Sequence, residues 1–174
     1  MYLLDTSIAS AAVDPNSPKH VAVRTFVTDT PLFADQIFLS VVTLAEMQAG
    51  LVMLPHRVPV PPAARVQEVE RRVQLASRLG TILPVSTHVA REHAMLKVAY
   101  ARKFTPNKLR QGTGLKGKPV ELWHENLTAS SLQVTENDLW IAATAIAHDL
   151  TLITADDDHI RMREADPRLR IMHF

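Results

Sequence analysis

Short apolar runs alternate with stretches of helical periodicity along most of the chain. Five runs have the length and composition of strands: Tyr2–Leu4, Ile37–Val42, Ile82–Val85, Leu150–Thr154 and Leu169–Phe174. Apolar residues at helical spacing predict helices over Lys19–Thr28, Leu44–Met53, Ala63–Leu79, Thr87–Lys103 and Thr135–Ala147. Strands alternating with helices are typical of an α/β fold in which a central parallel sheet carries helices on both faces.

Residues 105–134 interrupt this alternation. The segment is polar and contains three of the five glycines of the chain. We interpret it as a surface excursion or hairpin within one domain that spans residues 1–174. About 30 residues without clear structure are uncommon inside a compact domain, and such segments are usually functional or mobile.

Composition narrows the class of protein. A chain of 174 residues with 47% hydrophobic content is a normal size for one domain. The net charge of +1 gives no strong global attraction to nucleic acid, so any basic surface must be local. Cysteine is absent, which excludes disulfides and thiolate metal sites. No run approaches the roughly 20 apolar residues of a membrane span, and the N-terminus lacks a basic signal region. We expect a cytoplasmic protein.

Acidic residues follow the predicted strands. Asp5 comes directly after the first strand, Glu46 follows the second, and Asp156 follows the fourth, while Asp138 lies near the start of a predicted helix. Open parallel sheets bind ligands at the carboxyl ends of their strands. The pattern therefore predicts that carboxylates from distant parts of the chain meet at one edge of the sheet.

Such a cluster has a definite chemistry. Two carboxylates about 4 Å apart repel by about 4 kcal/mol at an effective dielectric constant near 20. The cluster must take up protons or bind a cation. A ligand set of oxygens alone favours Mg²⁺ or Mn²⁺ over zinc. A bound Mg²⁺ ion that keeps its waters can activate one of them to attack a phosphodiester.

Each acid also has a structural interpretation. Asp5 is a suitable helix cap, and Glu46 and Asp138 stand three residues after Thr43 and Thr135, where a capping box places an acid. The run Asp156–Asp158 is compatible with a solvated turn. Four unrelated caps need not gather at one sheet edge, so the joint pattern favours a metal site.

Four segments together resemble the PIN-domain proteins. They are Met1–Ser7, Leu39–Gly50, Asn137–Ala145 and Leu150–Asp156, and their order and spacing extend through nearly the whole chain. The branch that the chain resembles is the VapC-like toxins of toxin–antitoxin pairs. The resemblance implies a single PIN-like domain with Mg²⁺- or Mn²⁺-dependent endoribonuclease activity. It also implies an RNA substrate, an antitoxin partner and a homodimer.

The resemblance assigns roles to individual residues. Asp5, Glu46 and Asp138 match the metal-binding and catalytic acids of the family, and Asp156 matches a fourth position that is Asp or Asn in relatives. Thr6 or Ser7 matches a polar position that supports the metal site.

The chain departs from the family pattern in two respects. The family often has an acid and then Phe shortly after the fourth acid, but this chain has His159 and Ile160 there, and Asp158 is therefore a rival to Asp156. The segment 105–134 is also longer than expected, and its basic residues are candidates for contact with RNA phosphates: Lys108, Arg110, Lys116 and Lys118.

Other functional classes have weaker support. The eight histidines form no HExxH pair, and the chain has neither a dinucleotide-binding nor a P-loop glycine pattern. A Mg²⁺ phosphohydrolase of the haloacid dehalogenase type needs a second Asp at position 7, where the chain has Ser7. A catalytically inert PIN-like module that only binds RNA or protein is the remaining alternative.

Overall fold

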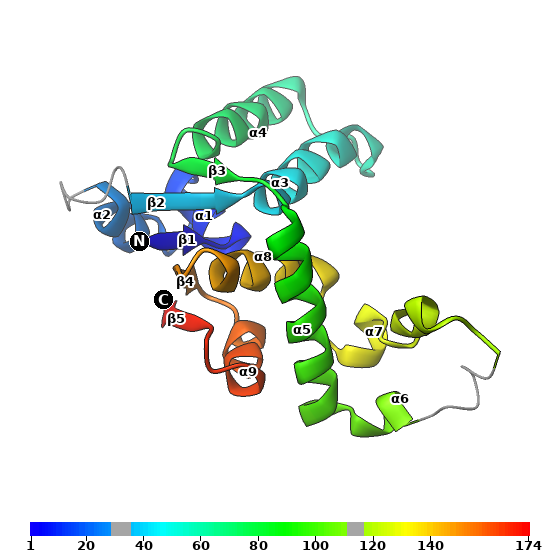
Figure 1. Cartoon of the computed structure of the whole chain (residues 1–174). Coiled ribbons are helices and arrows are strands. Elements are labelled where there is room, and N and C mark those ends of the chain that lie inside the picture. Colours follow the sequence, from blue (N-terminus) through cyan, green and yellow to red (C-terminus); the bar gives the residue numbers. More distant parts are fainter. Residues whose placement is uncertain (29–35, 111–116) are drawn as a thin grey trace.

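The computed structural model describes residues 1–28, 36–110 and 117–174. Its centre is a sheet of five parallel strands in the order β3-β2-β1-β4-β5, with β1 in the middle (Figure 1). The strands are β1 Tyr2–Leu4, β2 Ile37–Ser40, β3 Thr81–Leu83, β4 Thr151–Thr154 and β5 Arg170–His173. The predicted α/β fold with a central parallel sheet is confirmed.

Side chains of the central strands alternate between two cores. Successive residues of a strand point to opposite faces of the sheet. Leu3 and Leu152 accordingly belong to one buried cluster, while Leu4 and Ile153 belong to the other. These four residues are fully buried. Because both faces are covered, the central strands contain continuous apolar runs instead of alternating polar and apolar residues.

Helices cover both faces of this sheet, as predicted. The first cluster packs against α5 (Thr87–Phe104), α8 (Glu136–Ala147) and α9 (Asp157–Ala165). The second packs against α1 (Thr6–Val13), α2 (His20–Thr28) and α4 (Ala63–Ala76). Across the described parts of the chain, none of the helices combines the length and the apolar character that a membrane span needs.

The second strand ends earlier than predicted. The structure ends β2 at Ser40 and begins α3 (Val41–Met53) at the next residue, whereas the sequence predicts a strand as far as Val42. The Ser40 hydroxyl accepts a hydrogen bond from the amide of Val42 and caps the helix. Thr43 is therefore not the cap, and the capping-box interpretation of Glu46 is wrong. A short 3₁₀ turn, η2 (Leu54–His56), follows α3.

The described part of segment 105–134 is helical and not a hairpin. It forms α6 (Pro106–Arg110), the 3₁₀ helix η4 (Val120–Asn126) and α7 (Ala129–Leu132). The end of the segment does not lie on the surface, because Leu127, Leu132 and Val134 are buried in the first core cluster. The segment is thus anchored at its C-terminal end by apolar packing.

The helix α9 was not predicted from the sequence. Asp156 caps it by accepting a hydrogen bond from the amide of Asp158 at 2.9 Å. The acidic run is therefore the start of a helix and not a solvated turn. Only His159 and Met162 of α9 are buried, so the helix lacks the broad apolar stripe that makes a helix visible in a sequence.

A substitution at Gly80 tests the packing between β2 and the turn before β3. A Cβ atom there would lie 2.2 Å from the carbonyl oxygen and 2.6 Å from the carbonyl carbon of Ile37. Because backbone atoms cannot move aside cheaply, Gly80→Ala should lower the free energy of unfolding by about 1–3 kcal/mol or more. Urea denaturation measures the change.

Gly50→Ala is the matched control for this substitution. Gly50 lies inside α3 and has nothing within 4 Å of the added Cβ. Alanine at a helical position without steric conflict should stabilise the fold by about 0.5–1 kcal/mol. Equal effects of the two substitutions would contradict the close approach at Gly80.

Candidate metal centre at the sheet edge

Asp5 is buried at the carboxyl end of the central strand. Its side chain is 3% exposed and caps α1 by accepting a hydrogen bond from the amide of Ile8 at 2.7 Å. The Ser7 hydroxyl lies 2.9 Å from the same oxygen and donates to the carboxylate. Asp5 is thus both a helix cap and a member of the acidic cluster, so its two interpretations do not exclude each other.

A second hydroxyl fixes the other oxygen of Asp5. Thr154, the last residue of β4, donates to Asp5 Oδ2 at 2.5 Å and accepts from the amide of Asp156 at 3.0 Å. Since this hydroxyl has only one proton, its 3.1 Å contact with Nδ1 of the buried His159 requires the imidazole to donate. The histidine that replaces the expected acid therefore orients Thr154, which in turn orients Asp5.

Glu46 reaches the cluster from α3. One carboxylate oxygen accepts a short hydrogen bond from the Thr6 hydroxyl, and the other accepts from the side-chain amide of Asn137 at 2.8 Å. These contacts join three segments that are far apart in the sequence. They hold the carboxylate in one orientation beside the start of α8.

Asp138 and Asp156 complete the arrangement. Asp138 lies in the first turn of α8, where the Thr135 hydroxyl donates to its carboxylate at 2.6 Å. Carboxylate oxygens of Asp138, Asp156 and Asp158 lie within 4.8 Å of one another. Asp158 also approaches Arg161 at 3.5 Å, which partly compensates its charge.

All four predicted acids line one cavity. It has a volume of about 420 Å³, and its lining includes Thr6, Ser7 and Thr135 beside the acids Asp5, Glu46, Asp138 and Asp156. Asp158 does not line it. The cavity lining therefore includes both predicted supporting residues and every predicted acid except Asp158, whose carboxylate nevertheless lies within 4.8 Å of those of Asp138 and Asp156.

The pKa of Asp138 shows how burial and neighbouring charges affect ionisation in this cluster. Burial raises the pKa of this carboxyl above its ordinary value of 3.8, and the neighbouring charges of Asp156 and Glu46 raise it further. The hydrogen bond from Thr135 acts in the opposite direction. A bound cation would relieve the repulsion, and a donor set made only of carboxylate and hydroxyl oxygens fits a hard divalent ion.

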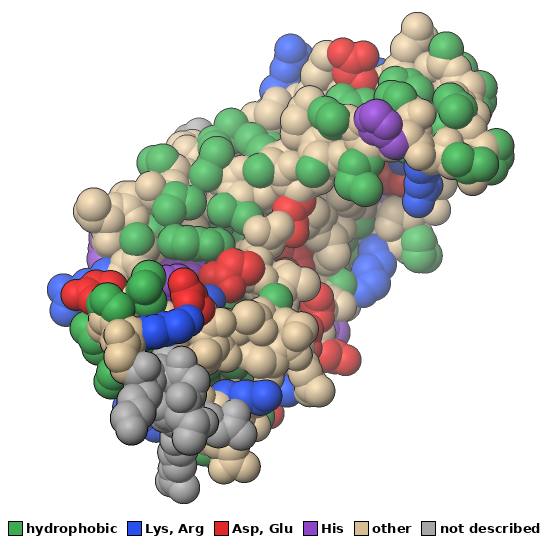
Figure 2. All heavy atoms as spheres, turned by 90° about the vertical axis from the view of Figure 1, so that its right-hand side faces the viewer, with side chains coloured by type: hydrophobic (Ala, Val, Ile, Leu, Met, Phe, Trp, Pro, Cys, Tyr) green, Lys and Arg blue, Asp and Glu red, His purple; other side chains and the backbone are tan. Residues whose placement is uncertain are grey.

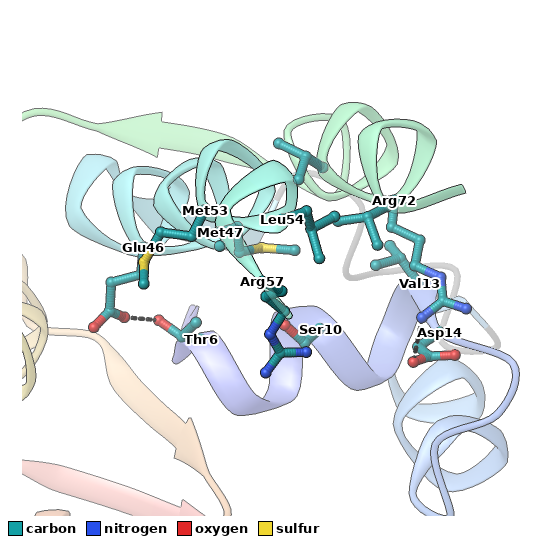
Figure 3. A pocket seen from close by; sticks show the side chains of 13 residues that line it. Thr6, Ser10, Val13, Asp14, Glu46, Met47, Met53, Leu54, Arg57 and Arg72 are labelled. Atoms are coloured by element: carbon teal, nitrogen blue, oxygen red, sulfur yellow. Dashed lines mark hydrogen bonds and ion pairs between the residues drawn. The ribbon is translucent and has the colours of Figure 1, made fainter. Parts of the chain in front are cut away.

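A groove leads away from Glu46 between α1, α3 and α4. Figure 3 shows Glu46 and Thr6 at one end, Arg72 beside Asp14 at the other, and Arg57 between them next to Ser10. The groove has a volume of about 460 Å³, and its lining mixes apolar side chains with polar and charged ones. It provides a surface that is continuous with the acidic cavity.

The structure describes the side chains of two of the four predicted RNA-binding residues, Lys108 and Lys118. Lys108 lines a different cavity, between α5 and η4. Lys118 forms an ion pair with Glu125 at 2.7 Å. Lys116 and the side chain of Arg110 lie outside the described residues.

Several residues that support the acids were missed in the sequence. Asn137, Thr154 and His159 hold Glu46 and Asp5 through the contacts described above. Thr154 offered a signal, because it is a hydroxyl residue at the end of a buried strand, two residues before an acid. Asn137 and His159 gave no signal, since their roles depend on contacts across the fold.

The fold and site define an α/β domain with carboxylates gathered at the carboxyl edge of its parallel sheet. Residues 2–165 match the family model of the PIN domain, and the chain belongs to that family. The acids of the site come from the segments whose sequence resembles PIN-domain proteins.

Relatives and solved structures extend this comparison. The chain is 33% identical over 92 residues to Ribonuclease VapC4 of Mycobacterium tuberculosis, a match that covers 51% of this chain and 65% of that protein. It is 29% identical over 138 residues to Ribonuclease VapC5 of the same organism, covering 75% and 71%. A crystal structure of VapBC-5, a member of the VapBC family of toxin-antitoxin systems from that bacterium, has the same fold. The TM-score is 0.57 at 22% sequence identity, and the match covers 99% of this chain and 97% of that chain.

Asp138→Asn tests whether ionisation of this carboxyl destabilises the folded state. A raised pKa means that the folded state disfavours the ionised carboxyl, so this group contributes stability below pH 3.8 that is lost as the pH rises through its folded pKa. The amide avoids this loss. Without divalent ions, Asp138→Asn should be more stable than the natural chain at pH 7, by no more than about 1 kcal/mol for a partly exposed group.

The pH dependence supplies the control for this prediction. Thermal unfolding of both proteins should give closely similar melting temperatures well below pH 3.8, where the carboxyl is protonated in both the folded and the unfolded states. Lower stability of the variant at pH 7 would mean that the carboxylate is favourably paired and not repelled.

Proposed function

We propose that this chain is a metal-dependent endoribonuclease and the toxin of a toxin–antitoxin pair. The observation that carries the proposal is the convergence of Asp5, Glu46, Asp138 and Asp156 on one cavity at the sheet edge. Membership of the PIN family and the similarity to two proteins named ribonucleases support the same activity.

The four acids would hold Mg²⁺ or Mn²⁺, with Asp158 close enough to Asp138 to assist. Such a cation supplies a water of lowered pKa and neutralises charge on the scissile phosphate. In the reaction, a water oxygen forms a bond to phosphorus, the bond to a ribose oxygen breaks, and that oxygen takes up a proton. Thr6, Ser7 and Thr154 contribute by holding Glu46 and Asp5 in place.

A protein partner fits the surface beside the site. Exposed apolar side chains gather where α3 leads into α4, at the upper end of the face in Figure 2: Val52, Met53, Val58 and Val60. Apolar clusters of this kind mark interaction surfaces. We propose that an antitoxin segment occupies the adjoining groove of Figure 3 and blocks access to Glu46. A homodimer, a cytoplasmic location and a single domain that includes residues 105–134 belong to the same proposal.

Removal of single carboxylates tests the activity. Asp5→Asn and Glu46→Gln should each lower metal-dependent RNA cleavage by about 100-fold or more, equivalent to roughly 3 kcal/mol of barrier. Circular dichroism should show that both variants remain folded. Asp157→Asn is the control, because Asp157 is adjacent in sequence but exposed and outside the cavity.

Calorimetric titration with Mn²⁺ separates an enzyme from an inert PIN-like module. The natural chain should bind the ion at a site that Asp5→Asn removes, whereas a module without a metal centre should give no such heat. Full cleavage by Asp5→Asn, or loss of cleavage in Asp157→Asn as well, would contradict the assignment of these acids.

A comparison of Asp156 and Asp158 decides which is the fourth acid. Asp156 lines the cavity with the other three acids, whereas Asp158 lies outside its lining and near Arg161. Asp156→Asn should therefore weaken Mn²⁺ binding more than Asp158→Asn, by about tenfold or more. The reverse order in the same titration would place Asp158 in the site.

A further inference from the structure

A second and larger cavity lies on the other side of the N-terminal turn of α8. It has a volume of about 780 Å³ and is bounded by α5, α6, η4 and α8. Both tryptophans of the chain, Trp123 and Trp140, line it.

The first turn of α8 separates this cavity from the carboxylates. Glu136 and Trp140, four residues apart on one face of the helix, line the large cavity. Thr135 and Asp138, three residues apart on another face, line the acidic cavity. An α-helix is about 10 Å across with its side chains. A nucleotide whose neighbour lies at the acids is therefore within reach of the large cavity.

The floor of the cavity is polar but its charges are compensated. The ammonium of Lys97 is 2.8 Å from Glu136 Oε2, and Nε2 of His93 is 2.8 Å from Glu136 Oε1. Lys97 and His93 are each only 8% exposed. Burial lowers the pKa of the His93 imidazole, which favours its neutral form, and Glu136 opposes that effect. It stacks on Trp140 at 3.8 Å between ring centroids.

Among the residues that the structure describes, the lining has no excess of either charge. Two lysines, Lys97 and Lys108, stand against two glutamates, Glu121 and Glu136. The described lining therefore does not favour a phosphate or an acidic peptide over a neutral ligand. A flat heteroaromatic ring that carries donors and acceptors but no charge suits such a surface, since bases bind proteins by stacking on aromatic side chains and by hydrogen bonding at their edges.

Trp123 is the exposed platform for stacking. It is 48% exposed, and its indole nitrogen donates to the carbonyl of Lys118 at 3.4 Å, which fixes the ring. Stacking on an aromatic side chain contributes about 1–3 kcal/mol for each base and requires an unpaired strand. The volume of the cavity is within the usual range for small-ligand sites.

We propose that this cavity receives one unstacked nucleobase of single-stranded RNA, from a nucleotide beside the scissile phosphate. The inference rests on the proposed ribonuclease function and adds a recognition site to it. Trp123 provides the stacking surface, and the Lys97–Glu136 pair with His93 provides the polar edge.

Tryptophan fluorescence gives a direct readout, because both tryptophans lie in the cavity. Single-stranded RNA oligonucleotides are titrated into the Asp5→Asn variant, which prevents cleavage during the measurement. The RNA should quench the fluorescence, and adding Trp123→Ala should weaken binding by about tenfold, as expected for the loss of one stacked base. Trp123→Phe should restore part of the affinity.

Leu122→Ala is the matched control. Leu122 is 39% exposed on the same 3₁₀ helix but does not line the cavity, so its removal should leave RNA affinity unchanged. Thermal unfolding of each variant verifies that the fold is retained. Equal losses for Leu122→Ala and Trp123→Ala would overturn the specific role of the tryptophan.

Oligonucleotides that lack the base at one position distinguish base binding from backbone binding. Affinity should fall for base removal next to the cleavage site and change little elsewhere. Uniform effects, or quenching by the antitoxin but not by RNA, would overturn the proposal. Metal-dependent cleavage by the natural chain is measured on the same RNA. Cleavage without base dependence refutes only this inference, whereas base binding without cleavage refutes the proposed function.

Discussion

The parallel pairing of β1 with both β2 and β4 is the constraint on which the rest of the structure depends. Leu4 is level with Leu39 on one side and Ile153 on the other, so the three strands end at the same edge. The acids that follow these strands are thereby delivered to one place. A shift of register by one residue would turn Leu3 and Leu4 to the wrong faces, so burial of both cores fixes the register that forms the site.

The hydroxyl and amide groups around the acids explain how like charges remain together in the fold. Ser7 and Thr154 donate to Asp5, Thr6 and Asn137 donate to Glu46, and Thr135 donates to Asp138. Hydrogen bonds to ionised groups are stronger than those between neutral partners, and they orient the oxygens before any ligand arrives. Burial is the main cause of the raised pKa of Asp138, and the charges of Asp156 and Glu46 add to it. A cluster with a remaining excess of negative charge is suited to a cation.

The sequence predicted the sheet and the four acids, because apolar runs, acids that follow strands and the PIN-like segment that contains Asp138 are local patterns. The prediction from sequence was wrong where the local structure depends on which of several neighbouring residues makes a contact. Ser40 displaced Thr43 as the cap of α3, and α9 has only two buried residues to reveal it. The support of Asp5 by Thr154 and His159, and the cavity around Trp123, require contacts across the fold that no local spacing encodes.

Two cavities on either side of the first turn of α8 give the proposed enzyme separate places for chemistry and for recognition. The central claim is that the acids of the first cavity, Asp5 after β1, Glu46 in α3, Asp138 in α8 and Asp156 at the start of α9, would hold one ion together. Anomalous X-ray scattering from crystals soaked in Mn²⁺ tests it directly. The account predicts a peak about 2.0–2.3 Å from carboxylate oxygens of both Asp5 and Asp138. Peaks only at acids outside this cavity, such as Asp149 or Glu125, would contradict it.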